Sequence, residues 1–196
     1  YGEFEKQSKS IIDGLSNEDQ KQAFRDVVTK RGSNIDRSLK QHVGSEAIRY
    51  DLDVSTALIK NEQDAAIKNY SKPQRVIESL KKQEDTIRQF GARNGISDEA
   101  LQGQILAAKS ATHESVINRM ISNDQDIGAQ SYLKKYKDQI SAEKLATIEK
   151  TVEDGSSRIF AQNFVDKYIG EDPEKVQGMI EKMSGKKREV VEQRYE

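Results

Sequence analysis

Two histidines, His42 and His113, are the first residues of this chain with the chemistry for acid–base catalysis or metal binding. Neither has a second histidine or an acidic partner at a spacing that would place metal ligands together on one helix face. There is no cysteine, which excludes disulfides and thiolate ligands. We expect each histidine to be either solvent-facing or structural between helices, and we predict no catalytic residue, no metal site and no cofactor.

A cluster of acidic residues resembles the start of a calcium-binding loop. Asp124 and Asp126 are followed by Gly128. A calcium loop requires glycine at its sixth position and glutamate at its twelfth, and neither falls there. We therefore predict that these residues cap a helix.

Glutamate followed directly by serine occurs at Glu78-Ser79 and at Glu114-Ser115. Transglycosylases that cleave peptidoglycan use such a glutamate as a general acid, which needs a cleft that raises its pKa. They also carry a downstream Gly-Leu-Met-Gln stretch, which is missing here. We predict that both pairs lie on charged helix surfaces. Phosphate loops, nucleophile elbows and dinucleotide fingerprints are missing too, so the sequence indicates a protein that is not an enzyme.

The seven tyrosines and five phenylalanines lie mostly among periodic apolar residues, so we expect most of them in the core. Tyr132, Tyr136 and Tyr195 have a second interpretation, as contact residues in an assembly.

The composition limits the width of any core. Charged residues make up 33% of the 196 residues and hydrophobic ones only 34%, whereas about 25% charged residues is usual. The 32 basic and 33 acidic residues nearly cancel, so no specific nucleic-acid binding is evident. No apolar run is long enough for a transmembrane segment.

The elements that must position these residues are helices. From Asn17 to Tyr70 the chain has no proline, and apolar or small residues recur at helical spacing in a single stripe. The stripe includes Val28, Ile35, Leu39, Val54, Ala57 and Ala65. A helix of that length would span roughly 80 Å. The pattern predicts an all-α, elongated bundle of antiparallel helices with one very long helix near the N-terminus.

Residues that typically start or end helices divide the chain further. Gly14 ends a first short helix and Ser16 is predicted to cap the long one. Lys72-Pro73 ends the long helix, and later caps at Ser97, Ser141 and Asp172-Pro173 start others. We predict two domains: an N-terminal hairpin with the long helix (1–72) and a repeat-like bundle of helical hairpins (73–196). Because the chain has no initiator methionine and stops within a helical pattern, we expect a fragment of a larger polypeptide.

Two stretches of the sequence resemble a known protein family. They are LSNEDQKQAFRDVVTKRGSNIDRSLKQH (15–42) and the segment from AIKNYSKPQRVIESL to YLKKYKDQIS (66–141), more than half of the chain. Their order of elements is similar to a helical region of internal virion (DNA-ejection) proteins of short-tailed phages. The elements fall on Leu15-Ser16, Phe24, His42, Tyr70 with Pro73, Ile96 to Ala100, and Val116 through Tyr132 to Ser141.

The resemblance implies a structural component of the virion that is delivered to the host cell envelope with the DNA. It implies self-association or contact with other virion proteins, and contact with the envelope. Such proteins often carry a transglycosylase domain elsewhere in the same chain, and residues after about Gly155 depart from the family pattern. The alternative is a helical-repeat adaptor that binds a partner protein on a concave surface.

Overall fold

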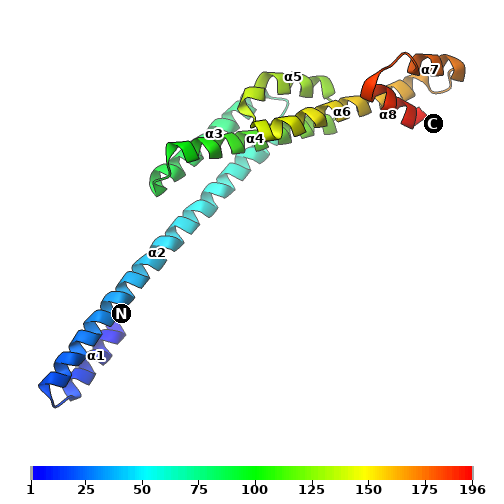
Figure 1. The fold of residues 1–196 in the computed structure, drawn as a ribbon. Coiled ribbons are helices and arrows are strands. Elements are labelled where there is room, and N and C mark those ends of the chain that lie inside the picture. Colours follow the sequence, from blue (N-terminus) through cyan, green and yellow to red (C-terminus); the bar gives the residue numbers. More distant parts are fainter. Residues whose placement is uncertain (1, 196) are drawn as a thin grey trace. The chain divides into compact units, whose positions relative to one another are not determined.

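The computed structural model describes residues 2–195, and every regular element in that range is helical (Figure 1). The predictions of an all-α protein and of one very long helix near its N-terminus are confirmed. No helix among the described residues has both the length and the hydrophobicity needed to cross a membrane.

The described helices follow one another with short connections (Figure 1). They are α1 (Gly2–Gly14), α2 (Glu18–Lys68), α3 (Pro73–Asn94), α4 (Asp98–Ser122), α5 (Asp126–Tyr136), the 3-10 helix η1 (Lys137–Gln139), α6 (Ala142–Tyr168), α7 (Pro173–Ile180) and α8 (Gly185–Tyr195). The 51 residues of α2 pass through Gly32 and Gly44 without interruption.

Most of the predicted helix ends are confirmed. Pro73 is the first residue of α3, where its missing N–H costs nothing, and Gly95 ends that helix with a φ of 66°. The Ser97 hydroxyl accepts a hydrogen bond from the amide of Ala100, and Asp172 caps α7 in the same manner.

The predicted cap of α2 is wrong by one residue. Asn17, and not Ser16, caps this helix: its side-chain oxygen accepts hydrogen bonds from the amides of Asp19, at 2.8 Å, and Gln20, at 3.3 Å. Both residue types are good caps, so the sequence alone does not separate neighbours.

The chain packs as two compact units, one ending at Asp53 and the next beginning at Val54, within α2. The domain boundary predicted from the sequence lies later in the chain, just before Pro73. The last turns of α2 belong with the second unit because Ile59 and Ala66 pack against the helices that follow.

In the first unit, α1 lies beside the beginning of α2 (Figure 1). The shielded residues recur at every fourth position: Phe4, Ser8 and Ile12 on α1, and Phe24, Val28 and Gly32 on α2. Spacing of four places these side chains on one face of each helix. The two helices form an antiparallel hairpin, whose loop has only three residues.

Beyond this hairpin, nothing in the first unit covers α2. Of residues 33–53, only Asp36, Glu46 and Asp51 are even partly shielded from solvent. Six large apolar residues of this stretch are therefore exposed: Ile35, Leu39, Val43, Ile48, Tyr50 and Leu52.

In the second unit, α4 is the central helix, and α3, α5 and α6 all contact it. The main core gathers residues from α2 to α6, including Ala66, Val76, Val116, Tyr132 and Ile148. From Ser55 onward the buried face of α2 runs through Ser55, Ile59 and Ala66. The single apolar stripe predicted for α2, which runs through Val54, Ala57 and Ala65, is therefore wrong here.

A smaller core joins the end of α6 to α7 and α8. It contains Ala161, Phe164, Val176, Ile180 and Val191. Every one of these side chains is at least nine-tenths buried, so the residues after Gly155 form a packed helical end of the second unit.

Candidate functional site

The two histidines occupy opposite environments. His42 is exposed on α2, whereas His113 is completely buried on α4. Of the residues with catalytic chemistry, His113 therefore has the most constrained surroundings, and the polar groups around it form the first candidate site.

Three side chains from α5 and η1 surround the His113 ring. Its Nδ1 lies 2.8 Å from the Tyr132 hydroxyl, and its Nε2 lies 3.4 Å from Oε1 of Gln139. Tyr136 stacks on the ring with centroids 5.1 Å apart. Both ring nitrogens are thus engaged within the protein.

The partners of His113 fix its protonation. Because the amide oxygen of Gln139 can only accept, Nε2 carries the proton and Nδ1 accepts from the hydroxyl of Tyr132. Burial lowers the pKa of His113 to about 4, and the charge of Lys109 acts in the same direction. Burial, with a smaller effect from Tyr136, raises the pKa of Tyr132. A neutral histidine without solvent contact has a structural role.

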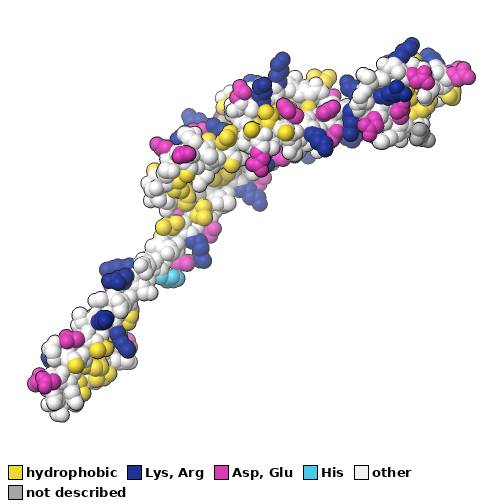
Figure 2. Space-filling model, in the orientation of Figure 1, with side chains coloured by type: hydrophobic (Ala, Val, Ile, Leu, Met, Phe, Trp, Pro, Cys, Tyr) yellow, Lys and Arg dark blue, Asp and Glu magenta, His cyan; other side chains and the backbone are white. Residues whose placement is uncertain are grey.

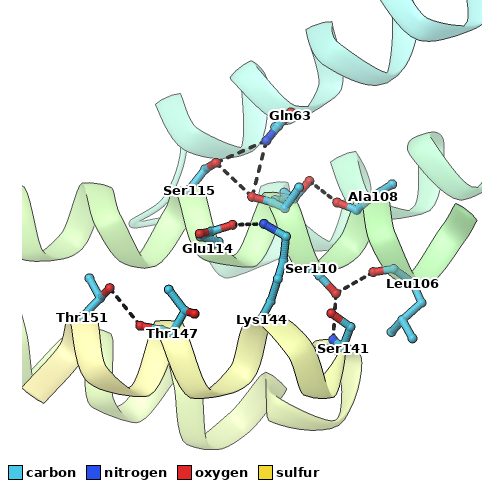
Figure 3. A network of polar contacts seen from close by, with 12 residues as sticks. Gln63, Leu106, Ala108, Ser110, Glu114, Ser115, Ser141, Lys144, Thr147 and Thr151 are labelled. Carbon is cyan, nitrogen blue, oxygen red and sulfur yellow. Dashed lines mark hydrogen bonds and ion pairs between the residues drawn. The ribbon is translucent and has the colours of Figure 1, made fainter. Parts of the chain in front are cut away.

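Other polar side chains of α4 bind the neighbouring helices (Figure 3). The Gln63 amide, from the end of α2, donates to the Ser115 hydroxyl at 3.2 Å and to the carbonyl of Ala111 at 3.4 Å. The Ser110 hydroxyl accepts from the backbone N–H of Ser141, just before α6, at 2.8 Å. These bonds attach α4 to two helices that are distant in sequence.

The α3 side of α4 is joined in the same way. The Thr112 hydroxyl donates to Oε1 of Gln83 at 3.0 Å, in a fully buried position. Glu84 accepts from Lys109 at 2.7 Å and from Arg88 at 2.8 Å, and these two bonds lower its pKa. A carboxylate held in its ionised form cannot serve as a proton donor near neutral pH.

The two Glu-Ser pairs are positioned differently from the prediction. Glu78 is half-buried and pairs with Arg75, and Ser79 is buried, at 6% exposure. Glu114 is half-buried and forms an ion pair with Lys144 of α6 (Figure 3). The expected location on a charged surface is wrong for Ser79, which α3 turns into the interior. Both glutamates lie at half-buried positions and form ion pairs.

The Asp124 region forms a helix connection. Its carboxylate accepts from Arg158 of α6 at 3.1 Å, and Asp126 is the first residue of α5. Among residues 2–195, no three histidine or acidic side chains lie close enough together to hold a metal ion.

The aromatic candidates belong to the packed interior. Tyr132 and Tyr136 are 8% and 6% exposed, which rules out a direct contact role in an assembly. Tyr195 is half-buried against the small core of α6 to α8.

Two grooves of the second unit have both carboxylates and lysines in their lining. One, of about 490 Å³, lies along α5 and α6 and contains the exposed carboxylates of Glu149 and Glu153 near Lys186 and Lys187. A second, of about 240 Å³, is lined by Glu84, Lys109 and Tyr136. In the second groove, hydrogen bonds from Lys109 and Arg88 lower the pKa of Glu84, which is the opposite of what a general acid requires.

The second candidate site is the exposed part of α2. Figure 2 shows hydrophobic side chains at the surface there, among charges of both signs. Leu39, Val43 and Tyr50 expose 53%, 59% and 73% of their surface. A single exposed leucine is ordinary, but a series of large apolar residues along one uncovered helix indicates an interaction surface.

No protein-family model, curated protein or solved structure matches this chain. The family resemblance of the sequence therefore remains a prediction. The geometry provides a polar junction around α4 in the second unit and an uncovered helix with exposed apolar residues in the first unit.

The sequence contained signals for part of this arrangement. Thr112 falls in the apolar series of α4 with Ile105 and Val116, and such a polar residue in a buried series needs a partner. The partner, Gln83, has no signal of its own, because it is flanked by charged residues and only the packing of α3 on α4 buries it.

Proposed function

We infer that this chain is a structural module of a phage virion protein of the internal, DNA-ejection type, which assembles through its helices. The observation that carries this proposal is the length of α2 that exposes apolar residues and packs against nothing else in the first unit. Isolated helices are marginally stable in water, so such a segment gains stability from a partner.

The polar residues of the second unit support the same proposal. In an enzyme, ionisable groups converge on a site with shifted pKa values. Here His113, Glu84 and Glu114 are each engaged by a side chain from a neighbouring helix. These groups hold helices together, which is the requirement of a part that must keep its shape.

Mass spectrometry of purified particles tests the role in the virion. In particles of a phage whose genome encodes this sequence, we expect its peptides in DNA-filled particles and a strong loss of them from particles that have ejected their DNA. Equal amounts in both would contradict a role in ejection, and absence from filled particles would contradict the virion assignment.

The alternative is a helical-repeat adaptor, favoured by the groove of about 490 Å³ along α5 and α6. An adaptor is expected to remain a monomer at every concentration and to bind a partner through this groove. For an adaptor, the Glu153→Lys substitution in this groove should abolish binding of the partner protein. Incorporation of the Glu153→Lys variant into particles at the normal level is what the structural proposal predicts.

A further inference from the structure

The uncovered face of α2 continues a face that already binds a helix. Phe24 and Val28 of α2 are shielded by α1, and the same helical spacing leads on to Ile35, Leu39 and Val43. Only the first two of these five residues, Phe24 and Val28, lie within the part of α2 that the hairpin shields, which ends at Gly32. The exposed continuation therefore has the shape and the polarity of a surface that packs against a helix.

The charges beside this surface select the direction of that helix. On the sides of α2 next to this surface, the part before Gly44 has two basic residues and one acidic residue, and the part after it has three acidic residues and one basic residue: Arg31, Lys40 and Asp36, then Glu46, Asp51, Asp53 and Arg49. Two copies of α2 in parallel would place like charges together. In an antiparallel pair, each basic half lies against an acidic half, and the two helix dipoles also oppose each other favourably.

We propose that the surface of α2 formed by Ile35, Leu39, Val43 and Tyr50 binds the same surface of a second copy in antiparallel orientation. The contact is centred at Gly44 and Ser45, where the basic half meets the acidic half. This inference rests on the proposed self-assembly and names the surface that performs it.

The spacing also describes how the two helices meet. Ile35, Leu39, Val43 and Ala47 form a row at intervals of four, and rows of this kind favour a crossing angle of about 50°. A crossing contact of this kind carries the second helix away from the turns that α1 already covers. The two-fold relation makes each half of the surface bind the other half.

Cysteine cross-linking tests the orientation, because the chain has no cysteine of its own. Leu39 and Tyr50 each lie five residues from the proposed centre, so Leu39 of one copy faces Tyr50 of the other. Leu39→Cys and Tyr50→Cys proteins, treated with a short bifunctional maleimide, should form many-fold more cross-linked dimer when mixed than either forms alone. The control is a mixture of Gln41→Cys and Ile48→Cys, which each lie three residues from the centre but on the opposite side of the helix.

Each outcome decides the question. Cross-linked dimer confined to the Leu39→Cys and Tyr50→Cys mixture supports the antiparallel contact. Equal or greater cross-linking within a single variant indicates a parallel pair and overturns the proposal, as does equal cross-linking of the control mixture or none at all. If cross-linking fails while the unmodified chain still self-associates, this surface is wrong but the proposed structural function stands. If both fail, the self-assembly is wrong as well.

Discussion

At the scale of single residues, burial converts side chains with catalytic chemistry into structural ones. His113 is completely shielded, accepts a hydrogen bond from Tyr132 and donates one to Gln139. Leaving a buried polar group without its partner lowers the stability of the folded protein by about 1–3 kcal/mol. These bonds therefore also make the arrangement of α4 with α5 and η1 specific.

The two tyrosines beside His113 provide a matched pair of variants. Tyr132→Phe removes the hydroxyl that donates to His113 and should lower the free energy of unfolding by about 1–3 kcal/mol. Tyr136→Phe removes a buried hydroxyl with no hydrogen-bond partner and should be neutral or slightly stabilising. Urea unfolding followed by circular dichroism measures both, and equal losses would contradict the assigned bond.

Stability should also depend on pH through His113. Above pH 6.5 the ring is neutral in both states, but below it the unfolded chain binds a proton that the folded chain, with a pKa of about 4, does not. The free energy of unfolding should therefore fall by about 3 kcal/mol as the pH drops from 6.5 to 4.

The variant His113→Gln isolates this contribution, because it removes the titrating group and keeps an amide that can donate and accept. The wild-type profile should be steeper between pH 6.5 and 4 than that of His113→Gln. The exposed His42 provides the control substitution, His42→Gln. Identical slopes for wild type and His113→Gln would show that the buried ring does not resist protonation.

At the scale of elements, helix ends were predictable, but the buried face at the end of α2 was not. Pro73, Gly95 and Ser97 act through local backbone geometry, so their effect is visible in the sequence. The buried face of α2 from Ser55 to Ala66 depends on where α3 and α4 meet it, which no local pattern specifies. The buried polar groups of the candidate site, such as Gln83, were missed for the same reason.

The cap of α2 gives a local test of this argument. Asn17→Ala should lower stability by about 1 kcal/mol, because it removes the oxygen that accepts from the amides of Asp19 and Gln20. Ser16→Ala, one residue earlier, should have much less effect. Thermal unfolding followed by circular dichroism compares them, and a larger loss for Ser16→Ala would restore the original prediction.

Close packing between α4 and α6 depends on a glycine. A Cβ atom added at Gly155 would lie 2.5 Å from a side-chain carbon of Ile121, so Gly155→Ala should destabilise the second unit by about 1–3 kcal/mol. Gly103, in α4, has open space around it, and Gly103→Ala should gain up to about 1 kcal/mol from helix propensity. Chemical denaturation separates the two, and a stabilising Gly155→Ala would show that α6 does not approach α4 this closely.

At the scale of the whole molecule, the two units have different roles in the proposed function. The second unit has buried cores and a polar junction that hold α3 to α6 together. The first unit has one short hairpin and a helix that leaves its apolar residues exposed. In the proposed function, the second unit keeps its shape and the exposed surface of the first unit packs against a partner.

Sedimentation velocity over a wide concentration range tests the claim that this exposed surface serves self-assembly. The account predicts a weight-average sedimentation coefficient that rises with concentration. It also predicts that the double variant Leu39→Glu with Tyr50→Glu stays monomeric while keeping its helical circular dichroism. A wild-type chain that sediments as a single monomer at every concentration would contradict the account.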